Sequence, residues 1–131
     1  MAGSTAKSSA GTPTVIQAYG AGGFRIDGEA YRGSILILPD RVESWAVADM
    51  SAVTMQSLAP VLAAMRDIDV LLLGCGARMA LVPPSLRQEL RAAGIVIDAM
   101  DTGAACRTFN VLRAEERRVA AALIAVGQEP G

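Results

Sequence analysis

Residues 94–123 read GIVIDAMDTGAACRTFNVLRAEERRVAAAL, and this stretch decides the predicted fold. The β-branched run at 95–97 predicts a short strand that is buried on both faces. Asp101 and Thr102 then supply side-chain oxygens of the kind that cap the start of a helix. The residues behind them keep the apolar spacing of a helix, with a stripe formed by Ala105, Phe109 and Leu112.

A second helix is predicted directly after the first. Glu115 and Glu116 lie where the helix dipole favours negative charge, and apolar residues recur behind them. These apolar residues are Val119, Ala122, Leu123 and Val126. The stretch is therefore expected to form a strand, a sharp turn and two consecutive helices.

Composition argues against several classes of function. The chain has 131 residues, of which 52% are apolar and 19% charged, and this is typical of one globular domain. A net charge of −1 without a basic block gives no sign of nucleic-acid binding. The chain contains no histidine, so the usual general base and the commonest metal ligand are missing. We therefore expect neither a metal nor another cofactor, and we favour a non-enzymatic protein while leaving an enzyme open.

The chain ends and the cysteines bear on domain limits and compartment. We expect a flexible tail over 1–13, one domain over 14–126 and a short tail over 127–131. No apolar run is long enough for a transmembrane helix, and the N-terminus lacks the apolar core of a secretory signal. Cys75 and Cys106 lack metal or redox spacing, which indicates reduced thiols in a cytoplasm-like compartment. The alanine- and arginine-rich composition favours a bacterial cytoplasm.

The first third of the chain has the pattern of an antiparallel β meander. The Asp27-Gly28 pair is a strong hairpin signal between two strands of alternating pattern. Strands are expected at 15–19, 24–26, 29–38 and 42–47.

The periodicity then becomes helical around Pro60, and parallel strands are expected beyond it. A buried strand over 70–73, a helix over 83–93 and the strand at 95–97 should form a βαβ unit. The predicted fold is therefore a mixed α+β (α/β) domain, made of an antiparallel β meander, a βαβ unit and two C-terminal helices.

A candidate site lies where the two parallel strands end. Their carboxyl ends should form a crevice of the kind in which open sheets bind ligands. Free amides at the start of the Thr102 helix, with Arg107 one turn further on, could bind a small anion there. Alternatively, the glycines only permit a tight turn and Arg107 pairs with a local acid. The candidate ligand- or partner-binding residues are Gly74, Cys75, Gly76, Asp101, Thr102, Cys106, Arg107 and Asn110.

Cys106 has two possible roles. A position near the start of a helix and a neighbouring Arg107 both lower the pKa of a thiol, which would make Cys106 reactive. Cysteine is also often buried as a small apolar residue, and no histidine is present to act as its base. We favour the structural role.

Several motifs give the chain a family resemblance between Phe24 and Leu123. The most specific is the string that begins at Met100-Asp101-Thr102, continues through Arg107-Thr108-Phe109-Asn110 and ends in the alanine-rich run at 118–123. Ala105 and Leu112 belong to the same string, which Glu115 completes together with that run. Weaker pieces are Phe24, Ile26, Tyr31, Gly33-Ser34, Trp45, the 71–76 turn and Gly94-Ile95. In these residues the chain resembles the small-domain family of the third mitochondrial complex I assembly factor and its bacterial and archaeal relatives.

The resemblance implies a three-layer β/β/α-type domain with no established catalytic activity. It also implies an assembly role with protein partners, among which we expect subunits of respiratory complex I. Self-association into a homo-oligomer stays open. An anion-binding protein or modest enzyme that uses the crevice remains the alternative. This chain departs from the family in having Cys75 where a threonine is usual, and Glu116 where glycine is usual. The second departure predicts that the bend there is made without a positive φ.

Overall fold

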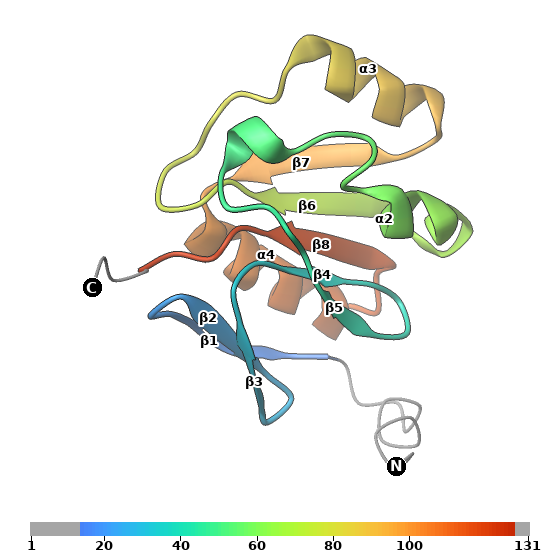
Figure 1. The fold of residues 1–131 in the computed structure, drawn as a ribbon. Coiled ribbons are helices and arrows are strands. Elements are labelled where there is room, and N and C mark those ends of the chain that lie inside the picture. The colour runs from blue at the N-terminus through green and yellow to red at the C-terminus, as the bar shows by residue number, and fades with distance from the viewer. Residues whose placement is uncertain (1–13, 128–131) are drawn as a thin grey trace.

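The structure is a computed structural model that describes residues 14–127 (Figure 1). The two predicted tails, 1–13 and 127–131, lie outside the described residues apart from Gly127.

Eight strands form two sheets within the described part of the chain. The smaller sheet is antiparallel and consists of β1 (Ile16–Gly20), β2 (Gly23–Ile26) and β3 (Glu29–Arg32). The larger sheet has the order β5 (Val42–Ser44), β4 (Ile35–Ile37), β8 (Val119–Leu123), β6 (Val70–Gly74) and β7 (Val96–Met100). In it, β6 runs parallel to both β7 and β8, whereas β4 runs antiparallel to β5 and β8.

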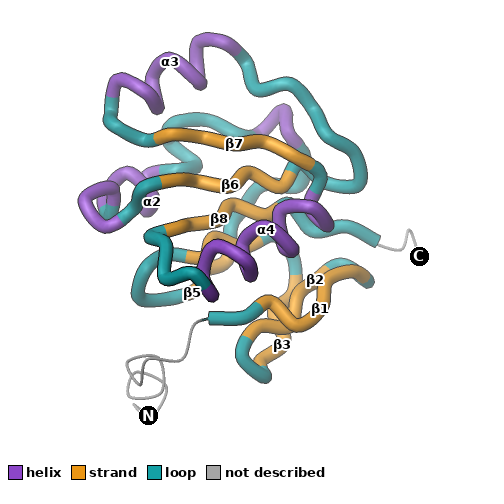
Figure 2. Tube along the Cα trace, turned by 180° about the vertical axis from the view of Figure 1, so that it is seen from behind, coloured by secondary structure: helices purple, strands orange, loops and turns teal. Residues whose placement is uncertain are grey.

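The larger sheet is the middle of three layers (Figures 1 and 2). Helices α2 (Ala59–Ala63) and α3 (Pro84–Ala92) cover one face, whereas α4 (Thr102–Ala114) and the smaller sheet cover the other. Two short 3-10 turns, η1 (Met50–Ala52) and η2 (Met65–Asp67), flank α2. The three predicted layers are confirmed, and the outer layer that holds the smaller sheet also holds α4.

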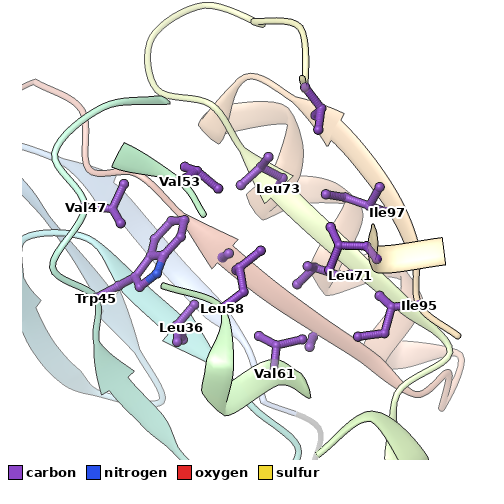
Figure 3. Close-up of a cluster of buried hydrophobic side chains, with 14 of the residues drawn as sticks. Leu36, Trp45, Val47, Val53, Leu58, Val61, Leu71, Leu73, Ile95 and Ile97 are labelled. Carbon is purple, nitrogen blue, oxygen red and sulfur yellow. The ribbon is translucent and has the colours of Figure 1, made fainter. Parts of the chain in front are cut away.

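Side chains of the larger sheet alternate between two apolar cores. Leu71 and Leu73 pack towards α2 and α3, where Trp45 closes the cluster (Figure 3). Leu72 packs on the other face, towards α4. The Trp45 indole nitrogen donates a hydrogen bond to the Ser57 carbonyl oxygen at 2.8 Å, so the ring is buried with its polar atom satisfied. The sheet is therefore covered on both faces, which explains why its central strands are apolar throughout.

The predicted βαβ unit is confirmed. Strands β6 and β7 pair in parallel from Val70 opposite Val96 to Gly74 opposite Met100, and α3 lies between them in sequence. Gly94 ends this helix with a φ of 92°, which only glycine adopts without strain. The carboxyl ends of β6 and β7 therefore lie side by side, as expected.

The predicted second C-terminal helix is wrong, because Val119–Leu123 is strand β8 in the middle of the larger sheet. All its residues are buried, and Ala120, Ala121 and Ala122 are fully so. Small side chains allow α4 to approach one face of β8 while the other face packs under α2. Burial between β4 and β6 outweighs the helix propensity of alanine here.

Three further boundaries differ from prediction. The single strand expected over 29–38 is divided into β3 and β4, which belong to different sheets. Gly33 lies between them with a φ of 80°, and this left-handed conformation turns the chain from one sheet into the other. The strand expected over 42–47 ends at Ser44, and the helix around Pro60 ends at Ala63.

The expectation that the bend at Glu116 avoids a positive φ is also wrong. Glu116 has a φ of 62° and follows the last turn of α4. Its amide donates to the Arg113 carbonyl oxygen at 2.9 Å, and the Arg117 amide donates to the Leu112 carbonyl oxygen at 2.9 Å. This is the Schellman pattern that ends many helices, with glutamate in the position that usually takes glycine.

Candidate functional site

Thr102 joins the ends of three elements at the start of α4. Its side chain is fully buried, and its hydroxyl donates to the Ile124 carbonyl oxygen at 2.7 Å while accepting from the Gly76 amide at 2.9 Å. A Cβ atom at Gly74 would lie 2.9 Å from the same hydroxyl oxygen. The absence of a side chain at Gly74 therefore lets β6 approach α4 closely, and Thr102 connects β6, β8 and α4.

The amides at the helix start are largely used by the protein itself. The Thr102 amide donates to the Gly76 carbonyl oxygen at 2.8 Å, and the Asp101 carboxylate accepts from the Ala104 amide at 2.8 Å. The Ala105 amide donates to the Asp101 carbonyl oxygen at 2.9 Å. An anion at this point would have to displace a carboxylate cap, so the geometry favours a structural turn at 74–76.

A groove lies next to this turn, between β1 and α4. It has a volume of about 280 Å³ and is lined by Ile16, Gln17, Ala18, Tyr19, Cys106, Arg107 and Asn110. It brings together three of the predicted site residues, Cys106, Arg107 and Asn110. The other five, at 74–76 and 101–102, do not line it.

Asn110 attaches β1 to α4. Its side-chain oxygen accepts from the Ile16 amide at 2.8 Å, and its side-chain nitrogen donates to the Ile16 carbonyl oxygen at 2.9 Å. The amide group thus takes the place of a neighbouring strand along the outer edge of β1. Asn110, a predicted binding residue, therefore fixes one wall of the groove with its side-chain amide.

Tyr19 contributes to the groove and was missed by sequence reasoning. Its ring lies over Gly103, where an added Cβ atom would collide with the Tyr19 hydroxyl. Tyr19 still keeps 44% of its surface exposed, so the phenol covers the start of α4 and faces solvent. In the sequence, Gly103 indicates that another group packs closely against the helix start. It does not indicate that this group is Tyr19 of β1.

Cys106 is buried, and burial raises the pKa of its thiol to about 12, against the opposing effect of Arg107. The thiol is therefore neutral at physiological pH, and this favours the structural role over the reactive one. Cys75 is also a buried free thiol, and its amide donates to the Met100 carbonyl oxygen at 2.8 Å.

Arg107 is exposed at the groove and takes part in no ion pair among residues 14–127. The ion pairs in that range join Arg41 to Asp40 and Glu43, and Arg118 to Asp69. The expected local acid is therefore not in place, and the guanidinium can bind a carboxylate or phosphate from outside the domain. Within the same range, no group of three or more cysteine or acidic residues could hold a metal ion.

The model of one protein family matches residues 16–124 and is described as a protein of unknown function (DUF498/DUF598). The chain belongs to this family. The match runs from β1 through β8, so it covers both sheets and the groove.

Two of the relatives found by sequence comparison represent the two kinds of protein in the family. The first, from Danio rerio, is named NADH dehydrogenase (ubiquinone) 1 alpha subcomplex assembly factor 3 and is 39% identical over 85% of this chain, which spans 64% of that relative's length. The second, an uncharacterised protein of Rhodobacter capsulatus, is 40% identical over 83% of this chain and 82% of its own length. Complex I assembly factors and bacterial proteins are therefore both among the relatives, as the sequence motifs predicted.

Solved structures of related bacterial proteins share the fold. A protein of Rhodopseudomonas palustris is 44% identical, with a TM-score of 0.79 over 89% of this chain and 87% of its own. A Mth938-like domain of Bordetella pertussis is 31% identical, with a TM-score of 0.76 over 89% of each chain. In this protein, none of the helices within residues 14–127 has the length and apolar character needed to cross a bilayer.

Proposed function

We propose that this chain is a protein-binding domain that acts like an assembly factor in the biogenesis of respiratory complex I. The observation that carries the proposal is its 39% identity to a relative named as an assembly factor of NADH dehydrogenase. The bacterial relatives support a bacterial origin, and the proposal takes the cytoplasm as the compartment.

The groove supports recognition of another molecule more than it supports chemistry. Cys106 holds a neutral thiol, and both polar atoms of the Asn110 side chain are occupied by β1. Arg107 and the Tyr19 hydroxyl are polar groups of the lining that can contact a bound partner. Asn110 also holds β1 in place, so the groove is preformed and a partner would bind without ordering it first.

The test is an affinity purification of the full chain, tagged and expressed at its native level in its own cells. Mass spectrometry of the wild-type sample should recover subunits of complex I, and Arg107→Ala should reduce their recovery at least fivefold. Arg87→Ala is the matched control, since Arg87 is exposed on α3 at the opposite face of the larger sheet. A wild-type sample without complex I subunits would overturn the proposal.

A second candidate function is the binding of a small anion. It is favoured by Arg107 and Tyr19, which both line the groove. Inorganic phosphate and succinate are suitable probes for a thermal-shift measurement. If this function is correct, either probe at millimolar concentration raises the melting temperature of the wild type but not that of Arg107→Ala. Equal behaviour of the two proteins would argue against it.

A further inference from the structure

The smaller sheet has an outer face without any acidic side chain. In its register Ala18 lies opposite Arg25, which lies opposite Ala30, and Gly20 lies opposite Gly23, which lies opposite Arg32. Residues directly opposite each other point to the same face, so these six share one face. The reverse face carries the buried Ile16, Phe24 and Ile26. The outer face therefore presents two arginines among residues with small side chains or none.

Arg107 extends this face across the groove. Ala18 lines the groove together with Arg107, and it pairs with Arg25 on its other side. Ala18 therefore lies between Arg25 on β2, its partner in the sheet, and Arg107 on α4, which lines the groove with it. We call the outer face and Arg107 together the arginine face, made up of Ala18, Gly20, Gly23, Arg25, Ala30, Arg32 and Arg107.

The arginines of this face lack carboxylate partners in the described part of the chain. Neither Arg25, Arg32 nor Arg107 belongs to an ion pair there, and Arg25 donates only to the Gly28 carbonyl oxygen at 3.2 Å. The chain as a whole has slightly more acidic than basic residues, 13 against 12. A face with three cations and no acid is therefore a local concentration of positive charge on a nearly neutral protein.

We propose that the arginine face docks an acidic segment of a protein partner, whose carboxylates pair with Arg25, Arg32 and Arg107. Guanidinium groups match carboxylates in a two-pronged geometry, and the small residues between them let a partner's backbone come close. Complementary charge also guides the encounter and selects the partner. A nucleic acid fits less well, because the chain has no basic block to follow a long phosphate backbone. This inference rests on the proposed function and names the chemistry of the partner.

Photo-cross-linking of the full chain in its own cells tests the docking surface. The photoreactive residue p-benzoylphenylalanine replaces Ala18, which is exposed on the face, or Gln88, which is exposed on α3 and serves as the control. Irradiation should give an adduct from position 18 alone, and its peptide should contain aspartate or glutamate. Combining Arg25→Glu with Arg107→Glu should reduce the yield at least tenfold, whereas Arg87→Glu should leave it unchanged.

Several outcomes would overturn the docking surface. They are the absence of an adduct, an adduct with nucleic acid, an adduct peptide without carboxylates, and a yield that does not respond to charge reversal. If the double glutamate variant unfolds, as judged by circular dichroism, the milder Arg25→Gln and Arg107→Gln pair must reduce the yield at least threefold.

The two proposals fail separately. Complex I subunits in the purification without a charge-dependent adduct at Ala18 would leave the assembly function standing and place the contact elsewhere. An acidic adduct from an unrelated protein, together with a purification that lacks complex I subunits, would keep the docking surface and remove the assembly function.

Discussion

Asn110 on α4 holds both backbone polar groups of Ile16 on β1, at 2.8 Å and 2.9 Å, although 94 residues separate the two in sequence. The contact joins the smaller sheet to the helix that follows the βαβ unit. It also fixes one wall of the groove that contains Arg107. Stability and recognition therefore depend on the same side chain.

Asn110→Ala should lower the free energy of unfolding by about 1–3 kcal/mol, because the Ile16 amide and carbonyl lose their partners in a partly buried place. Urea unfolding measures this change, and hydrogen exchange should show faster exchange of the Ile16 amide. The control is Gln17→Ala, which removes one exposed bond to the Gly28 amide and should cost less than about 0.5 kcal/mol. Equal costs for the two variants would contradict the anchoring role of Asn110.

Thr102→Val keeps the shape of the side chain and removes its hydroxyl. The buried Gly76 amide and Ile124 carbonyl then lose a partner each, so we expect a loss of about 2–4 kcal/mol in urea unfolding. Thr102→Ser keeps the hydroxyl and loses one buried methyl group, which should cost about 1 kcal/mol. If the valine variant were the more stable of the two, the hydroxyl would not be what connects β6 to β8.

The strands of the βαβ unit could be predicted because their sequence pattern fits a buried strand and not a helix. The apolar run at 70–73 is short and ends at Gly74, which is typical of a strand buried on both faces. The run at 119–125 is different, because all its residues are apolar and periodicity cannot separate a strand from a helix. The run is a strand because it pairs with β4 and β6, and those strands are remote from it in sequence.

The site could be predicted only on one side. Cys106, Arg107 and Asn110 are close in sequence on one helix, so their proximity follows from helical geometry. The opposite wall of the groove is formed by Ile16–Tyr19 of the edge strand β1. Nothing in the sequence of β1 indicates that it lies next to α4. At the crevice expected at 74–76, the Thr102 hydroxyl instead bonds to the protein's own backbone. The sequence shows that a hydroxyl is present there, but not which groups it binds.

Glu116→Gly should raise the free energy of unfolding by about 1 kcal/mol. A residue with a side chain is strained at a φ of 62°, whereas glycine adopts this conformation freely, and the Glu116 side chain is exposed. Thermal unfolding should therefore shift upwards by about 4 °C. Glu115→Gly is the matched control, since Glu115 has a φ of −89° and glycine there should destabilise the protein. Destabilisation by both glycines would contradict strain at Glu116.

Cys106 should make stability depend on pH in the alkaline range. Burial raises the pKa of its thiol from 9.0 to about 12 in the folded protein, so the folded state holds the proton more tightly than the unfolded state. Its contribution to stability is fully present below about pH 9 and is lost as the pH rises from 9 to 12. Urea midpoints measured over this range should fall more steeply for the wild type than for Cys106→Ala.

The same burial should protect Cys106 from alkylation. Iodoacetamide at pH 8 should label it only as fast as the protein opens, because the thiolate is the nucleophile and the native thiol stays neutral. Cys75→Ala supplies a protein in which Cys106 is the one remaining cysteine, and urea-unfolded protein gives the reference rate. Labelling of the folded variant at the unfolded rate would show an accessible thiolate, and with it the reactive cysteine that burial argues against.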